Sequence, residues 1–174
     1  MRLTGTFLDE ISHDIPHQNW GKQEWDRDFA AMKAIGIDTV ILIRCGWKRW
    51  MTFPSKVLQE ERSGFAPPVD LVRLFLDLSE KHGLSFYFGT YDSGEFWHQG
   101  KYQEEVDLCR KVVDEVWCLY GDSPAFKGWY LSQEVSRKVH SIVDLYASLG
   151  RHCKAISGGL PVLISPYIQG VKAV

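Results

Sequence analysis

The sequence lacks long hydrophobic runs, an excess of one charge and the common phosphate-binding and nucleophile motifs. No stretch of about 18 uninterrupted apolar residues occurs, so no membrane-spanning helix is predicted. The N-terminal residues MRLTGTFLDE include acidic and polar side chains too early for a signal peptide, while a leader removed before Met1 stays an open alternative. We expect a soluble protein, either cytoplasmic or exported.

The charge balance of the sequence does not favour binding to a polyanionic partner. Lys and Arg number 20 against 22 Asp and Glu, which gives a formal net charge of −2 and an isoelectric point near 6.3. Nucleic acids and anionic lipid surfaces are bound through basic patches, which this composition does not favour. Neither partner is therefore expected.

Cysteine and histidine are too scattered for a disulfide scaffold or a metal site. The four cysteines, at positions 45, 109, 118 and 153, form no CxxC pair. His13 and His17 are four positions apart, but Pro16 between them disfavours a helix. No HExxH, GxGxxG, GxxxxGKS/T or GxSxG motif occurs, so we predict no metal, no cofactor and no serine or cysteine nucleophile.

What the chain does contain is an alternation of short β-rich runs and amphipathic helices. With 174 residues, 45% of them hydrophobic, it can form one core, so a single domain over residues 1–174 is predicted. Four apolar stripes at helical spacing lie between the strands, and each predicted helix ends near a glycine, at positions 36, 83, 121 and 158–159. Ile35 belongs to the first stripe and Val143 to the fourth. The predicted strands are Leu3–Leu8, Thr39–Arg44, Leu84–Gly89, Lys127–Ser132 and Pro161–Ser165.

Five strands and four helices in this order predict an α/β fold with a parallel sheet and right-handed crossovers. At about 40 residues per unit, a closed (β/α)8 barrel of the TIM type would need about 300 residues, so this chain would be an incomplete barrel. An open, doubly wound sheet fits the length without remainder, but the first strand lacks the glycine-rich loop of nucleotide-binding members. Periodicity alone leaves both architectures open. The stretch Gly46–Pro68 is predicted to be a long loop.

In both architectures the active site gathers at the carboxyl ends of the strands. Carboxylates flanked by aromatic rings suit glycoside hydrolysis: one carboxyl group protonates the leaving oxygen, a second acts as nucleophile or base, and the rings stack on the sugar. Carbohydrate is therefore the predicted ligand class. The candidates that follow the predicted strands are Asp9, Arg44, Trp47, Tyr91, Asp92, Trp97, Gln133, Glu134 and Tyr167.

Glu134, at the end of the apolar run FKGWYLSQE, is the sharpest candidate. Partly buried beside Trp129 and Tyr130, its carboxyl group would have a raised pKa and could serve as a general acid. The structural alternative is a glutamate at a helix N-terminus that pairs with Arg137.

Other candidates also have structural alternatives. Asp9 and Glu10 are adjacent, so only one of them can enter the site, and we expect Glu10 to be solvated or to cap a helix. Asp92 precedes a Ser-Gly pair and could form an Asx turn. The tryptophans in predicted connecting segments, where an apolar ring needs cover or a ligand, are Trp47, Trp50 and Trp97.

The order of five motifs resembles a known family. GTFLDE, WDRDFAAMKAIGIDTVILI, FYFGTYDSGEFW, GWYLSQE and PVLISPYI together are similar to a bacterial family of glycoside-hydrolase-like barrels described as a domain of unknown function, DUF4434. Retaining barrel glycosidases typically carry an acid/base glutamate at the end of strand four, often after Asn, and a nucleophile glutamate at the end of strand seven. The resemblance thus implies that Glu134 is the acid/base, with Gln133 in place of Asn.

Strands six to eight and their nucleophile are missing from these 174 residues. We expect either a longer product that supplies the second half of the barrel, or an incomplete barrel that covers its edges by self-association. The favoured hypothesis is the N-terminal part of a glycoside-hydrolase barrel with Glu134 as acid/base and the other candidates around the sugar. The alternatives are a non-catalytic carbohydrate-binding or scaffold module, and a flavodoxin-like domain with an unidentified ligand, for which strand order is the discriminator.

Overall fold

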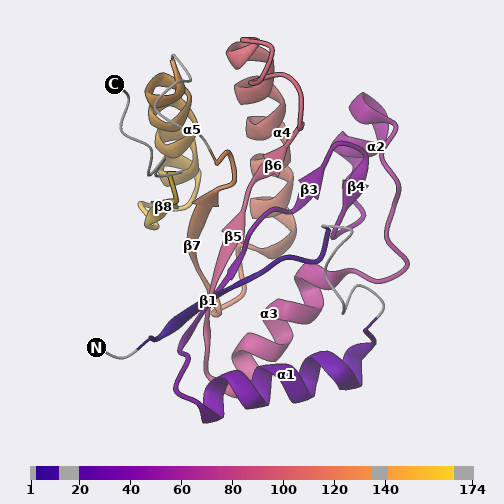
Figure 1. The fold of residues 1–174 in the computed structure, drawn as a ribbon, viewed down its shortest axis with the longest axis vertical. Coiled ribbons are helices and arrows are strands. Elements are labelled where there is room, and N and C mark those ends of the chain that lie inside the picture. The colour runs from indigo at the N-terminus through magenta and orange to yellow at the C-terminus, as the bar shows by residue number, and fades with distance from the viewer. Residues whose placement is uncertain (1–2, 12–19, 135–140, 167–174) are drawn as a thin grey trace, which may run out of the picture.

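The structure is a computed structural model that describes residues 3–11, 20–134 and 141–166 (Figure 1). Among the helices in these ranges, none is both long enough and apolar enough to cross a membrane. The strands are β1 (Gly5–Leu8), β2 (Thr39–Leu42), β3 (Gly46–Trp47), β4 (Trp50–Met51), β5 (Ser85–Gly89), β6 (Tyr91–Asp92), β7 (Phe126–Leu131) and β8 (Val162–Ile164). The helices are α1 (Lys22–Ala34), α2 (Lys56–Arg62), α3 (Leu71–His82), α4 (Tyr102–Tyr120) and α5 (Ile142–Ile156).

The main sheet is parallel and runs in the order β1-β2-β5-β7-β8. These are the five strands predicted from the sequence, each beside its predecessor. A doubly wound sheet would reverse its order at a switch point, so the flavodoxin-like alternative is wrong. The sheet is the sequential half of a barrel, built from α/β units.

Side chains on the inner face show that this sheet curls. Phe7 of β1 and Tyr130 of β7 lie three strand positions apart, which is about 14 Å in a flat sheet at the usual strand spacing. Their ring centroids are nevertheless only 5.2 Å apart, edge to face. Gly128 makes room for another inner ring, because a Cβ atom there would lie 2.3 Å from Cε1 of Tyr87. Aromatic rings therefore fill the concave face as they would the interior of a barrel.

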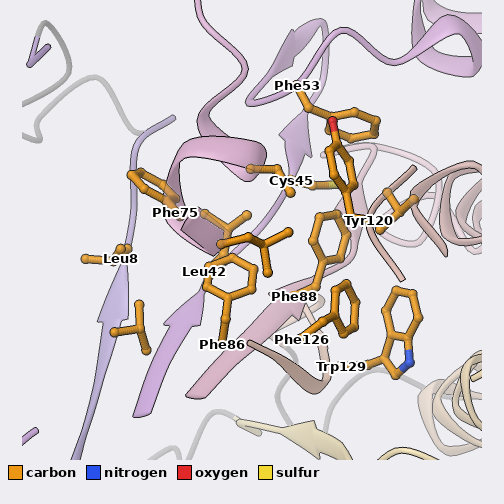
Figure 2. Close-up of a cluster of buried hydrophobic side chains, with 14 of the residues drawn as sticks. Leu8, Leu42, Cys45, Phe53, Phe75, Phe86, Phe88, Tyr120, Phe126 and Trp129 are labelled. Carbon is orange, nitrogen blue, oxygen red and sulfur yellow. The ribbon is translucent and has the colours of Figure 1, made fainter. Parts of the chain in front are cut away.

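The outer face of the sheet and the helices enclose the hydrophobic core. Figure 2 shows Leu8, Leu42, Phe88 and Trp129, from four successive strands, together with Phe75 of α3. Helices α1 and α3 pack side by side, as do α4 and α5 (Figure 1). Each fully buried side chain of this kind contributes about 1.5–3 kcal/mol, so the outer layer stabilises the curl of the sheet.

Two predicted stripe residues lie outside the core. Ile35 follows the last turn of α1 and is exposed, and Val143 of α5 is exposed because the buried stripe of that helix runs through Ile142, Leu145 and Leu149 instead. Gly121 ends α4 as predicted, but in a right-handed conformation, whereas Gly83 ends α3 in the left-handed one.

The predicted loop Gly46–Pro68 is in fact structured. It contains β3, β4 and α2, and β3 pairs with β4 and with β6 in a small second sheet of order β4-β3-β6. In Figure 1, β3 and β6 continue beyond the carboxyl ends of β2 and β5. The small sheet therefore stands directly over the edge where the sequence placed the site.

Candidate active site

Parallel pairing brings the carboxyl ends of β2, β5 and β7 to one edge of the sheet, which we call the mouth. Arg44 follows β2, Asp92 ends β6 just beyond β5, and Glu134 follows β7 by three residues. Arg44 Nη1 lies 3.7 Å from Asp92 Oδ2. Two residues far apart in the sequence thus form an ion pair at the mouth.

Asp92 is buried and held by several donors. Its Oδ1 atom accepts hydrogen bonds from Trp97 Nε1 at 2.9 Å and from the backbone N–H of Gly94 at 2.8 Å. The bond to Gly94 is the Asx turn that the sequence suggested. With only 4% of its surface exposed, Asp92 is held in a fixed position.

Glu134 is exposed rather than partly buried. Trp129 lies on the opposite, helix-covered face of the sheet, where its Nε1 donates to Ser157 Oγ at 3.1 Å. Tyr130 is the neighbour of Glu134 at the mouth. Burial raises the pKa of the Tyr130 hydroxyl, the Ser165 hydroxyl lowers it, the Glu134 carboxylate raises it and the Arg44 guanidinium lowers it. The Tyr130 hydroxyl therefore lies within electrostatic reach of both charged groups.

Gln133, the residue before Glu134, faces the interior. Only 1% of it is exposed, and its Nε2 donates to the Tyr91 carbonyl at 2.9 Å and to Glu105 Oε1 at 2.8 Å. The same Glu105 oxygen accepts from the backbone N–H of Ser93 at 3.2 Å. Burial raises the pKa of Glu105, the bonds from Ser93 and Gln133 lower it, and the Asp92 charge raises it. A buried polar cluster thus lies directly beneath the mouth.

Two aromatic candidates are also interior residues. Tyr91 is fully buried, and its hydroxyl donates to the Lys48 carbonyl at 2.6 Å. Trp97 packs against Val106, Ile142 and Leu145 in a second, smaller cluster. Both rings support the mouth from within and are covered by protein rather than by open space.

The remaining candidates are more accessible. Trp47 is partly exposed, with Lys48 Nζ 4.4 Å from the centroid of its ring. Asp9 is partly buried and its Oδ1 accepts from the Ile11 N–H at 3.2 Å. Tyr167, His13 and His17 lie outside the described residues. Among the residues that are described, no three His, Cys, Asp or Glu side chains lie together as metal ligands would.

Glu10 is not solvated, which was one of the two roles predicted for it. It is 9% exposed, and it lines a pocket of about 450 Å³ with Trp20, Trp50 and Phe65. Burial raises the pKa of Glu10 to about 8, with a further contribution from the charge of Asp9. It is therefore an enclosed carboxyl group near the end of β1, whereas solvation had been expected.

The sequence analysis missed two polar residues near the mouth, Glu105 and Tyr130, and it did not predict that Glu10 is buried. A signal existed for Glu105, because it lies four residues before Cys109 on the buried stripe of α4. Alternation along β7 places Gly128 and Tyr130 on one face, which could have assigned Tyr130 to the concave side. No pattern in the sequence marks Glu10 as buried.

A family model described as "Domain of unknown function (DUF4434)" matches residues 3–174. The chain belongs to this family. No curated protein matches the sequence of this DUF4434 chain. Among solved structures, a protein from Bacteroides thetaiotaomicron described as a "putative alpha-L-fucosidase" is 52% identical, with a TM-score of 0.91. The match covers 97% of the DUF4434 chain and 52% of the Bacteroides protein, so the chain spans about half the length of that relative.

More distant structures share the fold of the DUF4434 chain. A GH2 beta-galacturonidase from Eisenbergiella tayi is 14% identical with a TM-score of 0.59, and the match covers 94% of this chain and 25% of that one. A family 5 glycoside hydrolase from Bacteroides vulgatus is 12% identical with a TM-score of 0.59, over 84% of this chain and 32% of that one. The fold of the DUF4434 chain is therefore an incomplete barrel of the (β/α)8 type.

Proposed function

We propose that this chain carries the acid/base side of a glycoside-hydrolase active site, with Glu134 as the acid/base residue. The observation that carries the proposal is the position of Glu134: an exposed carboxyl group just past the fourth strand of a curled parallel sheet with sequential strand order. Barrel enzymes hold their catalytic residues at the carboxyl ends of the strands.

In this proposal Glu134 works as an acid and then as a base. Protonated Glu134 gives its proton to the leaving oxygen as the glycosidic bond breaks, and the resulting carboxylate takes a proton from the incoming water. Arg44 and Asp92 orient sugar hydroxyls, with Asp9 and Trp47 at the edge of the site. The second carboxylate that this chemistry needs comes, in the proposal, from outside the described residues.

Removal of the Glu134 carboxyl group tests the mechanism. In the protein as its gene encodes it, Glu134→Gln should reduce kcat on 4-nitrophenyl α-L-fucoside by about 10²- to 10⁴-fold, which is the usual contribution of general acid/base catalysis. This substrate is tried first because of the Bacteroides relative, followed by other 4-nitrophenyl glycosides. Glu104→Gln, at an exposed glutamate in the first turn of α4, is the matched control. Unchanged turnover in Glu134→Gln removes that residue from the mechanism.

A non-catalytic carbohydrate-binding role is the second candidate. It is favoured by the burial of three carboxyl groups near the mouth, because Asp92, Glu105 and Glu10 are all enclosed by protein. Calorimetric titration with L-fucose distinguishes the roles. Binding that persists in Glu134→Gln, together with a wild-type protein that cleaves none of the glycosides, supports binding alone.

A further inference from the structure

One oxygen atom inside the protein is bonded to both segments that carry the mouth carboxylates. Glu105 Oε1 accepts from the backbone N–H of Ser93, which directly follows Asp92. It also accepts from the side-chain amide of Gln133, which directly precedes Glu134. Asp92 ends β6 and Glu134 follows β7, so a single side chain of α4 joins the two segments.

The surroundings make this connection rigid. Glu105 is 1% exposed, so water cannot replace its partners easily. The Gln133 amide also donates to the Tyr91 carbonyl, to which Cys109 Sγ donates at 3.0 Å. On its other side, the Tyr146 hydroxyl of α5 donates to the Gln133 carbonyl. Gln133 is thus held by two helices and by the end of β6, while the next side chain, Glu134, stays exposed.

We propose that Glu105 is a positioning residue, whose buried carboxyl group fixes the turn that carries Asp92 relative to the segment that carries Glu134. Its importance for turnover rests on the proposed function of Glu134. Glycoside chemistry depends on the separation between carboxyl groups, and a misplacement of about 1 Å can cost about 100-fold in rate. A group that sets the relative position of two strand ends therefore controls the rate without touching the sugar.

Substitutions at Glu105 separate positioning from folding. Glu105→Ala removes the shared acceptor and should lower kcat by about 10- to 100-fold with little change in KM. Glu105→Gln keeps an acceptor oxygen at the same place and should restore kcat to within a few-fold of wild type. The matched control is Glu115→Ala, because Glu115 lies on the same helix and also accepts two bonds, from the Lys56 N–H and from Ser55 Oγ, away from the mouth.

Hydrogen exchange followed by NMR provides a readout that needs no turnover. The Ser93 amide and the Gln133 side-chain amide should exchange slowly in the wild type and in Glu115→Ala, and at least 10-fold faster in Glu105→Ala. Unchanged exchange in Glu105→Ala overturns the proposal, and so does wild-type kcat in a variant whose exchange is fast. If the wild type cleaves no glycoside, the proposed function fails, and the exchange experiment alone then decides whether Glu105 holds the two segments.

Discussion

Four carboxyl groups near the mouth show how strongly burial separates residues of the same chemistry. Glu134 is exposed, whereas Asp92 is enclosed and bonded to an arginine, a tryptophan and a backbone N–H. Glu105 and Glu10 are enclosed, and burial raises the pKa of both. At the residue scale, the environments of these carboxyl groups differ: Glu134 is open to solvent, Asp92 is held in place by its hydrogen-bond donors, and Glu105 and Glu10 are buried.

The raised pKa of Glu10 predicts a stability that falls as the pH rises. In the unfolded chain Glu10 ionises near its ordinary value of 4.5, and in the folded chain near 8. Below pH 4.5 Glu10 is protonated in both the folded and the unfolded chain, so its ionisation does not change the free energy of unfolding. Between pH 4.5 and 8 the folded state retains a proton that the unfolded state has lost, so the free energy of unfolding decreases with pH.

Urea denaturation at pH 5 and pH 8 measures this effect. Between these pH values, the free energy of unfolding of the wild type should fall by about 1–3 kcal/mol more than that of Glu10→Gln. This is less than the full shift of the Glu10 pKa from 4.5 to about 8 would give at about 1.4 kcal/mol for each pKa unit. The matched control is Glu104→Gln, which should lose as much as the wild type. Equal losses in wild type and Glu10→Gln would show that Glu10 is not the titrating group.

The sequence predicts which residues gather at the mouth better than it predicts where they point. Parallel strands of similar length bring Arg44, Asp92 and Glu134 to one edge, and this follows from position alone. Orientation depends on partners distant in the sequence: Gln133 turns inward because Glu105, on α4, provides its acceptor. Such a contact leaves no periodic signal within the segment GWYLSQE.

At the scale of elements, the five main strands were predicted because each is a compact apolar run covered on its outer face by helices. The segment Gly46–Pro68 was predicted as a loop because its strands are two residues long and show no alternation. Its order comes instead from pairing with β6 and from the Ser55 cap of α2, whose side chain accepts from the Leu58 N–H. Pairing across such a distance is invisible to a local pattern.

Two glycines predict opposite effects of the same substitution. In β5, a Cβ atom on Gly89 would lie 2.0 Å from the Leu42 carbonyl oxygen, so Gly89→Ala must push two strands apart. In α5, a Cβ atom on Gly150 would meet its nearest neighbour, Val162 Cγ1, at 3.7 Å. Gly89→Ala should therefore destabilise by about 3 kcal/mol, and Gly150→Ala should stabilise by about 0.5–1 kcal/mol. Urea midpoints test both, and a neutral Gly89→Ala would contradict the tight β2–β5 contact.

At the scale of the molecule, periodicity could not choose between a curled and a doubly wound sheet, because both use the same βα units. The choice depends on which strands become neighbours and on the packing of Phe7 against Tyr130 across the concave face. Both are long-range properties. The family resemblance identified in the sequence supplied what the local patterns could not.

The two outer strands of the main sheet, β1 and β8, lead us to predict that copies of this protein associate. Phe7 on β1 is 46% exposed and Ile164 on β8 is 49% exposed. Unpaired strand edges with apolar side chains attract further strands. A protein consisting of residues 1–174 should therefore elute in size-exclusion chromatography with light scattering at a multiple of 20.0 kDa.

A charge on an edge strand should reverse this behaviour. Ile164→Lys is expected to shift the mass toward the monomer at the same concentration. Ile35→Lys, at a position that is 76% exposed and lies at the end of α1 rather than on an edge strand, should leave the mass unchanged. A monomeric wild type at all concentrations would show that the edges are protected in another way.

The small sheet extends over only part of the mouth, on the side of β2 and β5. Beyond β2 and β5 the chain continues as β3 and β6, which extend past the edge of the main sheet. In contrast, β7 is followed directly by Ser132, Gln133 and Glu134 (Figure 1). On the side of β2 and β5, a ligand at the proposed site of Glu134 would therefore meet the small sheet. Bulky ligand groups on that side should be rejected.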